Sequence, residues 1–420
     1  MSNKIVIIFT IIKAIITLDE SNIYNSSLKN TDIFGKYYDK AKTLLKKMRL
    51  EEKVGQVFNT RYDNKTKEEL KTYHYGGLTL FANHFENKTK SQLLSELKDL
   101  DKLSKLNLSF AVDEEGGKVV RISKYKAFRN ESFKSPQEYY KEGGIPKILE
   151  AEKEKRKFIK DLYLNINFAP VADFTTDPSS YIHFRTLGQN LSETEKYISE
   201  VVKAANKDNF TTCLKHFPGY GSNGDTHKES IHDTRELEEF RKIDFKPFIA
   251  GIKENVPMIM VSHNIIDKVD PIYPSSISAK IHKILREELN YTGLIITDDI
   301  SMGAITYFKK NDSIPITALL CGNDIILTSN NSESYKELLG FIKKNDKYKI
   351  ILDNAVTRIL AYKLQYGIVK FDEGSSIFKI IIIILAVVLV VGVLVYFFVF
   401  RKRDNSSPDF NEKLTNENGF

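Results

Sequence analysis

Two adjacent aspartates follow an apolar run in the C-terminal third of the chain. The run, Leu294–Thr297, has the composition of a buried strand, and Asp298 and Asp299 come directly after it. A carboxylate at a strand end is held rigidly, which suits nucleophilic attack on the anomeric carbon of a sugar through an oxocarbenium-like transition state. Metal binding is the competing use of paired aspartates, but no His or carboxylate spacing completes such a site. Asp298 is therefore a candidate nucleophile, and we expect no metal.

A glycine-rich stretch carries an Asp-x-His pair. It begins at Lys215 and His216, runs through Pro218 and several glycines, and ends at Asp225 and His227. A solvated surface residue is the default interpretation of any single histidine. Here, however, Asp225 can hold the imidazole by a hydrogen bond and favour its charged form. Such a group can transfer protons near neutral pH, so His227 is the candidate acid/base and Asp225 its partner.

A third motif, Val112–Arg121, joins an apolar run to acidic residues, a glycine pair and an arginine. Asp113 could accept hydrogen bonds from two vicinal hydroxyls, which is how a carboxylate recognises a sugar. Gly116 and Gly117 let the backbone approach a ligand closely. Chance explains this motif alone as well as function does, so its weight depends on the other two motifs.

Short apolar runs alternate with helical stretches between the two ends of the chain, which predicts an α/β fold with a parallel sheet. Eight such units with right-handed crossovers favour closure into a (β/α)₈ TIM barrel as a single catalytic domain. An open doubly wound sheet is the alternative, but no Gly-x-Gly-x-x-Gly turn opens the first helix. The candidate strands are Gly55–Asn59, Leu78–Phe81, Leu108–Val112, Ile166–Ala169, Thr211–Leu214, Met258–Ser262, Leu294–Thr297 and Asp324–Leu327. Amphipathic segments that follow them include Ser91–Leu106, Leu191–Asp208 and Ala279–Leu289.

Polar residues stand at the ends of five of these runs. Strand C-termini converge on one mouth of a barrel, so the residues that follow them would share one pocket. The simpler explanation, that polar residues merely mark strand ends, accounts for one or two such positions but not for acids, a lysine and histidines at five. The residues are Asp113, Asp173, Lys215, His216, His263, Asp298 and Asp299.

These residues together resemble glycoside hydrolase family 3, specifically its single-domain β-N-acetylhexosaminidases. The resemblance runs from about Met48 to about Gly367 and covers nearly all of the chain between its two apolar ends. It also includes the segments Asn167–Asp173, Met260–His263, Leu285–Leu289 and Ala318–Asp324. Tyr220 departs from the family pattern, which commonly has a second histidine there, and the loop before Asp225 looks slightly shortened.

The resemblance implies a role for each matching residue. Asp298 matches the nucleophile that forms the glycosyl-enzyme, and His227 with Asp225 matches the acid/base pair. Using histidine departs from the two-carboxylate arrangement usual in retaining glycosidases. His263 and Met302 lie in the matching motifs and join the candidates for substrate binding. The full set of substrate-binding candidates is Asp113, Arg121, Arg185, Lys215, His216, His263 and Met302.

The activity implied is hydrolysis of terminal, non-reducing β-linked N-acetylglucosamine with retention of configuration. Peptidoglycan-derived or chitin-type glycans are the expected substrates, and no cofactor is implied. Within the family, a β-glucosidase-type member or a phosphorolytic one is the alternative, the latter because a histidine does not repel phosphate. From another class, a catalytically silent surface glycan-binding protein would be expected to have lost the nucleophile or the histidine, and both remain.

The two ends of the chain predict export and a membrane anchor. Residues 1–20 resemble a signal peptide, with Lys4 before the apolar stretch Ile5–Leu18. Residues 378–400 include the uncharged apolar run Ile380–Phe400, which predicts a transmembrane helix. The basic residues that follow it predict a cytoplasmic tail, 401–420. The sequence thus predicts a single-pass membrane protein whose catalytic domain, residues 21–370, lies at the cell surface or in a vesicle lumen.

Composition argues against a nucleic-acid partner. The net charge of +7 comes from Lys and Arg scattered along the chain, whereas a nucleic-acid groove would need a clustered stripe. Cys213 and Cys321 make no disulfide framework, although a single bridge between them stays open at this point. The oligomeric state is not indicated.

Overall fold

The computed structural model describes residues 19–221, 231–306, 313–371 and 376–403. Contact clustering separates a large unit, Met1–Val369, from a small one, Lys370–Phe420. The large unit holds the elements that surround the predicted site. The small unit contains helix α15, Ser376–Arg403, and is described by itself.

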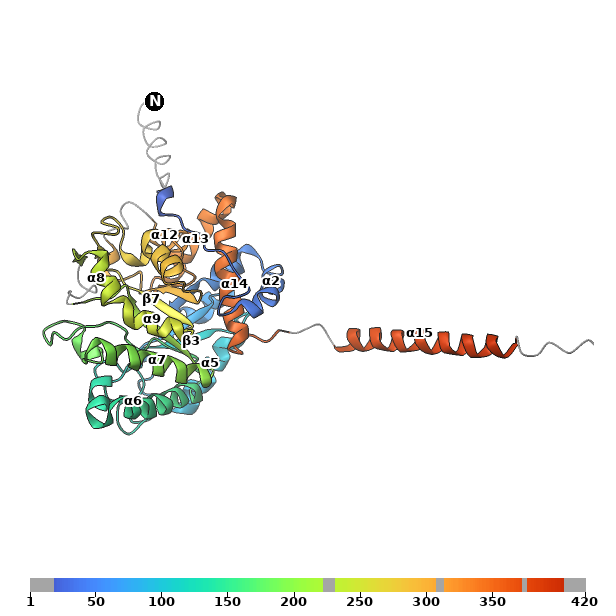
Figure 1. The fold of residues 1–420 in the computed structure, drawn as a ribbon, viewed down its shortest axis with the longest axis horizontal. Helices are drawn as coiled ribbons and strands as arrows, with labels where there is room; N and C mark the ends of the chain where they lie inside the picture. Colours follow the sequence, from blue (N-terminus) through green and yellow to red (C-terminus); the bar gives the residue numbers. More distant parts are fainter. Residues whose placement is uncertain (1–18, 222–230, 307–312, 372–375, 404–420) are drawn as a thin grey trace, which may run out of the picture. The chain divides into compact units, whose positions relative to one another are not determined.

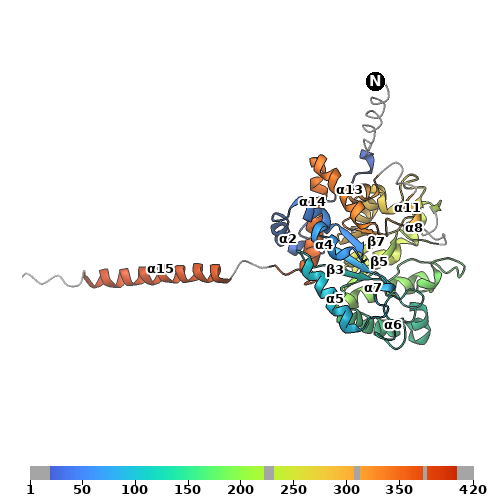
Figure 2. The same ribbon diagram turned by 180° about the vertical axis from the view of Figure 1, so that it is seen from behind.

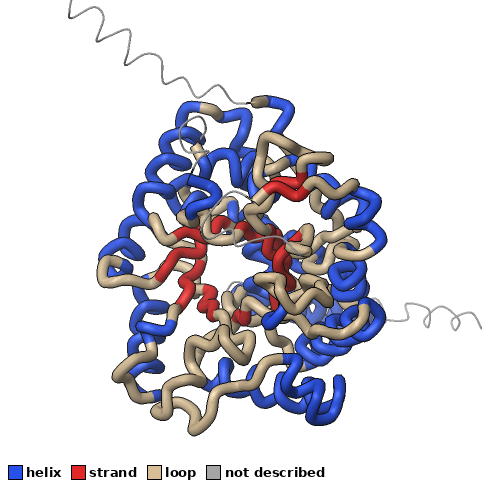
Figure 3. Tube along the Cα trace, turned by 90° about the vertical axis from the view of Figure 1, so that its left-hand side faces the viewer, coloured by secondary structure: helices blue, strands red, loops and turns tan. Residues whose placement is uncertain are grey.

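Eight parallel strands form a nearly closed barrel at the centre of the large unit, with helices outside them (Figure 3). The strands neighbour one another in the order β10-β1-β2-β3-β4-β5-β7-β9. An isolated parallel bridge between Ile296 of β9 and Ile325, the residue before β10, brings the two ends of this order together. This confirms the α/β barrel that the sequence predicts. The strands are β1 Phe58–Arg61, β2 Gly77–Leu80, β3 Ser109–Val112, β4 Ile166–Asn167, β5 Thr211–Phe217, β7 Met258–Val261, β9 Leu294–Thr297 and β10 Ile326–Thr328.

Helices connect successive strands and form the outer layer, seen from two sides in Figures 1 and 2. A small parallel pair, β6 (His232–Asp233) and β8 (Ile265–Ile266), lies beside the barrel sheet. The helices of the large unit are α2 Tyr38–Leu45, α3 Leu50–Gln56, α4 Thr66–Tyr73, α5 Lys90–Leu103, α6 Pro136–Asp161, α7 Leu191–Lys207, α8 Leu237–Lys242, α9 Phe245–Lys253, α10 Ala279–Lys283, α11 Gly303–Thr306, α12 Ile314–Leu320, α13 Asn331–Lys344 and α14 Lys349–Gln365.

Helix α7 shows why these segments form where they do. The Asn190 side chain accepts a hydrogen bond from the Glu193 backbone and so caps the first turn. Apolar residues then recur every three or four positions, and Ile198, Val201 and Val202 are all buried against the barrel. The helix therefore presents one apolar face to the sheet and one polar face to solvent.

The first predicted strand is displaced along the chain. Gly55 belongs to helix α3, and the strand runs from Phe58 to Arg61 instead. The Arg49 backbone N–H donates to the Glu52 carboxylate at 2.9 Å, which caps the start of helix α3. The helix includes the first residues of the predicted strand. The displacement matters because it places Arg61 at the end of a barrel strand.

The predicted transmembrane helix is corrected by the structure. Within the described residues, no helix is both long enough and apolar enough to cross a bilayer. The prediction of a single-pass membrane protein with a cytoplasmic C-terminus is overturned with it. The predicted signal peptide falls almost wholly in residues 1–18, and the tail beyond Arg403 in residues 404–420, outside the described residues.

A buried lysine closes the N-terminal end of the barrel. Lys363 of α14 is 1% exposed, and its Nζ donates to Gln56 Oε1 at 2.9 Å, to the Gly76 carbonyl at 2.7 Å and to the Asn107 carbonyl at 2.9 Å. Gly76 directly precedes β2, and Asn107 lies two residues before β3. One side chain thus satisfies three acceptors at the base of three neighbouring segments.

We expect Lys363→Met to destabilise the folded protein by roughly 3 kcal/mol, because it leaves buried acceptors without a donor. Urea unfolding followed by circular dichroism measures the change. Lys102→Met is the matched control, since Lys102 is 75% exposed and, within the described residues, pairs only with Asp99 of its own helix. Equal midpoints for the two variants would show that Lys363 does not hold the barrel base together.

Candidate active site

The strand register determines which side chains enter the barrel mouth. Side chains alternate between the two faces of a strand, and Arg61 pairs with Thr79, which pairs with Ala111. Thr79 also donates through Oγ1 to Asn59 Oδ1 at 2.6 Å, which places these residues on one face. Continuing two residues from Thr79 and Ala111 brings Phe81 and Asp113 to the same face at the C-terminal end of the strands.

The register places Cys213 and Asp298 on this same face. Cys213 pairs with Met258, which pairs with Leu294, and Asp298 follows Leu294 by four residues. Cys213 is completely buried, and burial raises the pKa of its thiol. The negative charges of Asp113 and Asp298 raise it further, while the charge of Lys215 lowers it. The charged groups at the ends of β3, β5 and β9 thus all act on the Cys213 thiol, in keeping with strand ends that share one face.

Lys215 is the centre of a buried charge network. Its Nζ lies 2.7 Å from Asp113 Oδ1 and 2.7 Å from Glu115 Oε1, and its side chain is only 3% exposed. Burial lowers the pKa of this ammonium group, but the charges of Asp113 and Glu115 outweigh burial and raise it. Lys215 is therefore held in its charged form between two carboxylates.

Arg185 completes the network from the other side of Glu115. Arg185 Nε and its terminal nitrogen Nη2 donate to the two carboxylate oxygens of Glu115 at 3.0 and 2.7 Å, a bidentate contact. Burial raises the pKa of Glu115, but the charges of Arg185 and Lys215 hold it well below its usual range. The Lys155 Nζ, from helix α6, donates to the Glu115 carbonyl at 2.9 Å and fixes the backbone there.

His216 is oriented by a second buried carboxylate. Its Nδ1 lies 2.7 Å from Asp173 Oδ2, which also accepts a hydrogen bond from the His216 backbone at 3.0 Å. The other oxygen of Asp173 accepts the Tyr220 backbone N–H at 2.8 Å. Nε2 of the ring lies 3.3 Å from Arg185 Nη2, so the histidine adjoins the Glu115 network. These contacts fix the orientation of the imidazole.

Asp298 begins a turn that several side chains hold in place. Its backbone N–H donates to the Val261 carbonyl at 2.9 Å, and its Oδ1 accepts the Asp299 N–H at 2.8 Å. Asp299 in turn accepts from the Ser329 backbone at 3.1 Å and from Ser329 Oγ at 2.5 Å. The Met302 N–H donates to the Asp299 carbonyl at 3.0 Å. Asp298 is half-buried, which fits a group that meets a ligand.

His263 lies beneath this turn. It is completely buried, with Nδ1 2.7 Å from Ser276 Oγ and Nε2 2.9 Å from the Asp299 carbonyl. Both ring nitrogens are therefore engaged by the protein. The geometry is that of a support for the Asp298–Asp299 turn.

The Glu114 side chain fixes the loop that carries Arg121. Its carboxylate accepts the backbone N–H groups of Arg121 and Ile122, both at 2.8 Å, and a hydrogen bond from Ser123 Oγ. Arg121 itself is half-buried, with its guanidinium carbon 5.9 Å from the centre of the Phe81 ring. The two adjacent glutamates therefore have different roles. Glu114 fixes the loop backbone, and Glu115 pairs with Arg185 and Lys215.

The structure therefore brings together most of the predicted site and leaves one part undescribed. Asp225 and His227 belong to residues 222–230 and lie outside the described residues. Sequence reasoning missed the partners Glu115 and Lys155, and it placed Asp173 at the mouth without a role. The one sequence signal for Glu115 was its position directly before the glycine pair. Its partners come from distant segments, so the sequence did not indicate its role.

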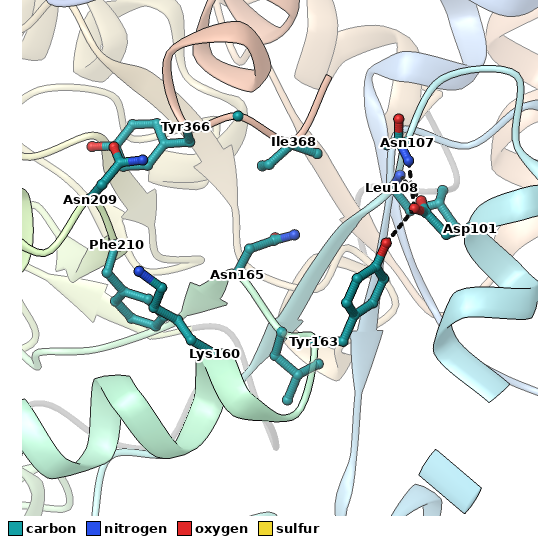
Figure 4. Close-up of a pocket in the computed structure, with 12 residues that line it drawn as sticks. Asp101, Asn107, Leu108, Lys160, Tyr163, Asn165, Asn209, Phe210, Tyr366 and Ile368 are labelled. Carbon is teal, nitrogen blue, oxygen red and sulfur yellow. Dashed lines mark hydrogen bonds between the residues drawn. The ribbon is translucent and has the colours of Figure 1, made fainter. Parts of the chain in front are cut away.

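A cavity at the opposite end of the barrel is distinct from this site. Its volume is about 260 Å³, and none of the predicted site residues lines it. Figure 4 shows Tyr163 donating to Asp101 at its edge, 2.8 Å between the two oxygens. Among the described residues, no group of three or more His, Cys, Asp or Glu is placed to hold a metal ion.

Comparison with known proteins identifies the family. The model described as the glycosyl hydrolase family 3 N-terminal domain matches residues 49–362. A β-hexosaminidase of Idiomarina loihiensis is 30% identical over 295 residues, which are 67% of this chain and 85% of that protein. A β-hexosaminidase of Methylococcus capsulatus is 29% identical over 271 residues, 63% of this chain and 78% of that protein.

Solved structures share the fold. A family 3 β-N-acetylglucosaminidase from Paenibacillus sp. superposes with a TM-score of 0.69 at 23% identity, over 78% of this chain and 65% of that chain. The β-N-acetylhexosaminidase from Beutenbergia cavernae gives 0.67 at 21% identity, over 75% and 98%. The family match and the barrel mouth agree with the family that the motifs predict: the chain belongs to glycosyl hydrolase family 3 and is a glycosidase.

Proposed function

We propose that the protein is a retaining β-N-acetylhexosaminidase that removes terminal, non-reducing N-acetylglucosamine. The observation that carries the proposal is that Asp298 follows the C-terminal end of β9, on the strand face that also carries Lys215 of β5 and its partner Asp113. The curated relatives named β-hexosaminidase support the same activity. Peptidoglycan-derived or chitin-type glycans are the proposed substrates.

In the proposed mechanism, Asp298 attacks the anomeric carbon and forms a glycosyl-enzyme as the bond to the departing oxygen breaks. A water then attacks the same carbon from the opposite face, releases Asp298 and restores the original configuration. The turn that holds Asp298 suits this role, because a carboxylate with a fixed backbone needs little reorganisation to reach the transition state.

We propose His227 as the group that protonates the departing oxygen and later takes a proton from water, with Asp225 as its partner. This assignment rests on the Asp-x-His motif and on membership in the family, since both residues lie outside the described residues. An imidazole can perform both transfers because its pKa lies close to neutral pH.

Sugar recognition is assigned to the charge network. Asp113 and Lys215 can bind vicinal hydroxyls, and Arg185 with His216 can bind the adjoining part of the ring. Arg121 and Met302, both half-buried at the mouth, complete the proposed contacts. For His263, whose ring nitrogens both contact the protein, we propose a positioning role rather than contact with the sugar.

Replacing Asp298 by glycine tests the nucleophile. We expect kcat/KM for 4-nitrophenyl β-N-acetylglucosaminide to fall by more than about 1,000-fold, because the covalent route is removed. Added azide is then expected to restore turnover and to give the α-glycosyl azide, since it attacks from the face that Asp298 occupied.

Asp346→Asn is the control for the Asp298 variant, because Asp346 is 80% exposed and Lys349 is its one ion-pair partner in the part of the chain that the structure describes. It should leave kcat/KM unchanged. Undiminished activity in Asp298→Gly, or an azide product of β configuration, would remove Asp298 from the proposed mechanism.

Glu115→Gln tests the charge network. We expect kcat/KM to fall about 100-fold, chiefly through a higher KM, because Arg185 and Lys215 lose the carboxylate that orients them, a cost of about 3 kcal/mol or more for a broken buried pair. Glu115→Asp keeps the negative charge, so its KM should lie between those of the wild type and Glu115→Gln.

Glu154→Gln is the matched control, since Glu154 is 59% exposed and also pairs with an arginine, Arg129. Steady-state kinetics on folded protein, verified by circular dichroism, separate KM from kcat. If Glu115→Gln lowers only the amount of folded enzyme and leaves KM unchanged, the network does not orient the sugar-binding groups.

A further inference from the structure

The cavity at the N-terminal end of the barrel is built from the loops that lead into the strands. Leu108, Asn165 and Phe210 line it, and they directly precede β3, β4 and β5, respectively. The turn that follows α14 adds Tyr366 and Ile368. Catalytic groups of a parallel barrel lie at the C-terminal ends of the strands, so this cavity is at the far end from the barrel mouth.

Asn165 presents a fixed hydrogen-bond donor to the cavity. Its Oδ1 accepts the Phe110 backbone N–H at 2.9 Å, and its own backbone N–H donates to the Phe110 carbonyl at 3.0 Å. Because Oδ1 faces an N–H donor, the other arm of the side-chain amide is the NH₂ group. Nδ2 has no acceptor within the described part of the chain. The side chain is half-buried, and Figure 4 shows it between the two sides of the cavity.

Asn209 supplies a second amide from the loop between α7 and β5. Its φ is 49°, in the left-handed region, which asparagine tolerates better than most residues. The residue is exposed, and its side chain makes no hydrogen bond with the residues that the structure describes. In the view of Figure 4 it lies on the same side of the cavity as Tyr366, with Tyr163 on the other side.

Aromatic side chains give the cavity apolar surface on both sides. Phe210 is buried, and the half-buried Tyr366 ring has its centre 5.1 Å from that of the Tyr362 ring. Across the view of Figure 4, the centre of the Tyr163 ring lies 5.9 Å from that of the Phe110 ring. These packing partners hold the rings in place, so a ligand that stacks on them costs little side-chain entropy.

The acid that lines the cavity is saturated by protein donors. Asp101 accepts the Leu108 backbone N–H at 2.6 Å, the Asn107 Nδ2 at 2.5 Å and the Tyr163 hydroxyl at 2.8 Å. Burial and the hydrogen bond to Asp101 raise the pKa of Tyr163 to about 12, and burial raises the pKa of Tyr366. Both phenols are therefore neutral at pH 7, and the polar surface is made of uncharged groups around a neutralised carboxylate.

This lining fits a neutral ring that carries hydroxyl groups. A hydroxyl both donates and accepts, so it can pair with either arm of an amide, while the C–H face of a sugar packs on an aromatic ring. An anion gains little, because Lys160 is exposed to solvent and its Nζ already donates to the Asp208 carbonyl at 2.9 Å. The volume of about 260 Å³ lies just below the range of roughly 300–1,000 Å³ for drug-sized ligands, which suits a single sugar unit.

We propose that this cavity is a non-catalytic sugar-binding site that takes one neutral sugar unit. It binds the sugar through the amides of Asn165 and Asn209 and the ring of Tyr366. The inference does not depend on the proposed function, because it rests on the lining of the cavity alone. A site there holds a neutral glycan at the end of the barrel away from the proposed nucleophile.

Hydrogen–deuterium exchange of the full chain, read by mass spectrometry, tests the site. The probe is N-acetylglucosamine, which has no glycosidic bond and is not consumed, and cyclohexanol is the comparison, a six-membered ring with a single hydroxyl. At saturation the sugar should slow exchange in peptides spanning 160–166 and 206–210 about threefold, because it closes the opening through which these backbone groups meet water. Cyclohexanol should leave both peptides unchanged.

Two variants connect this protection to the lining. Asn209→Gly removes the amide without backbone strain, since glycine adopts a φ of 49° freely, and the sugar concentration for half-maximal protection of peptide 160–166 should rise about tenfold. Tyr366→Leu removes the ring and should abolish the protection. Asn255→Gly is the matched control, because Asn255 is also exposed with a positive φ, 59°, and does not line the cavity. Circular dichroism verifies that each variant is folded.

Unchanged exchange at up to about 100 mM sugar, protection confined to the barrel mouth, equal protection by cyclohexanol, or equal weakening by Asn209→Gly and Asn255→Gly would overturn the site. Failure of the proposed function gives a different result. In that case the wild-type chain would leave 4-nitrophenyl β-N-acetylglucosaminide uncleaved, while protection of the two peptides by N-acetylglucosamine remained.

Discussion

The candidate active site depends on a buried ammonium group shared by two carboxylates. Lys215 lies 2.7 Å from both Asp113 and Glu115, and Glu115 is also held by both donors of Arg185. Charges buried in this way are tolerated only when each one is paired, because removing a single partner leaves an uncompensated charge. The positions of the polar groups at the mouth are therefore interdependent, and the barrel fixes all of them together.

This constraint explains how one rim can hold two kinds of positive group. Arg185 and Lys215 are neutralised by acids inside the barrel, so they can orient neutral hydroxyls without attracting anions strongly. Arg61 and Arg121 instead contact the Phe81 ring, and neither is paired with an acid in the described part of the chain.

Much of this arrangement could be predicted from sequence because strand ends converge in a parallel barrel. Apolar runs located most strands, and the residue after each run located Asp113 and Asp298. The role of Glu115 could not be predicted, since its partners Arg185 and Lys215 lie 70 or more residues away and only folding brings them close. The start of the first strand was predicted too early, because a capped helix occupies the beginning of that apolar run.

Trapping the proposed glycosyl-enzyme is the most direct test of the central claim that Asp298 forms a covalent bond to the sugar. The full chain would be incubated with a 5-fluoro N-acetylglucosaminyl fluoride, which slows release of the intermediate, and the labelled peptide identified by mass spectrometry. The account predicts one added sugar per chain, attached to Asp298. A label on another carboxylate, or steady turnover with no adduct at any time, would contradict it.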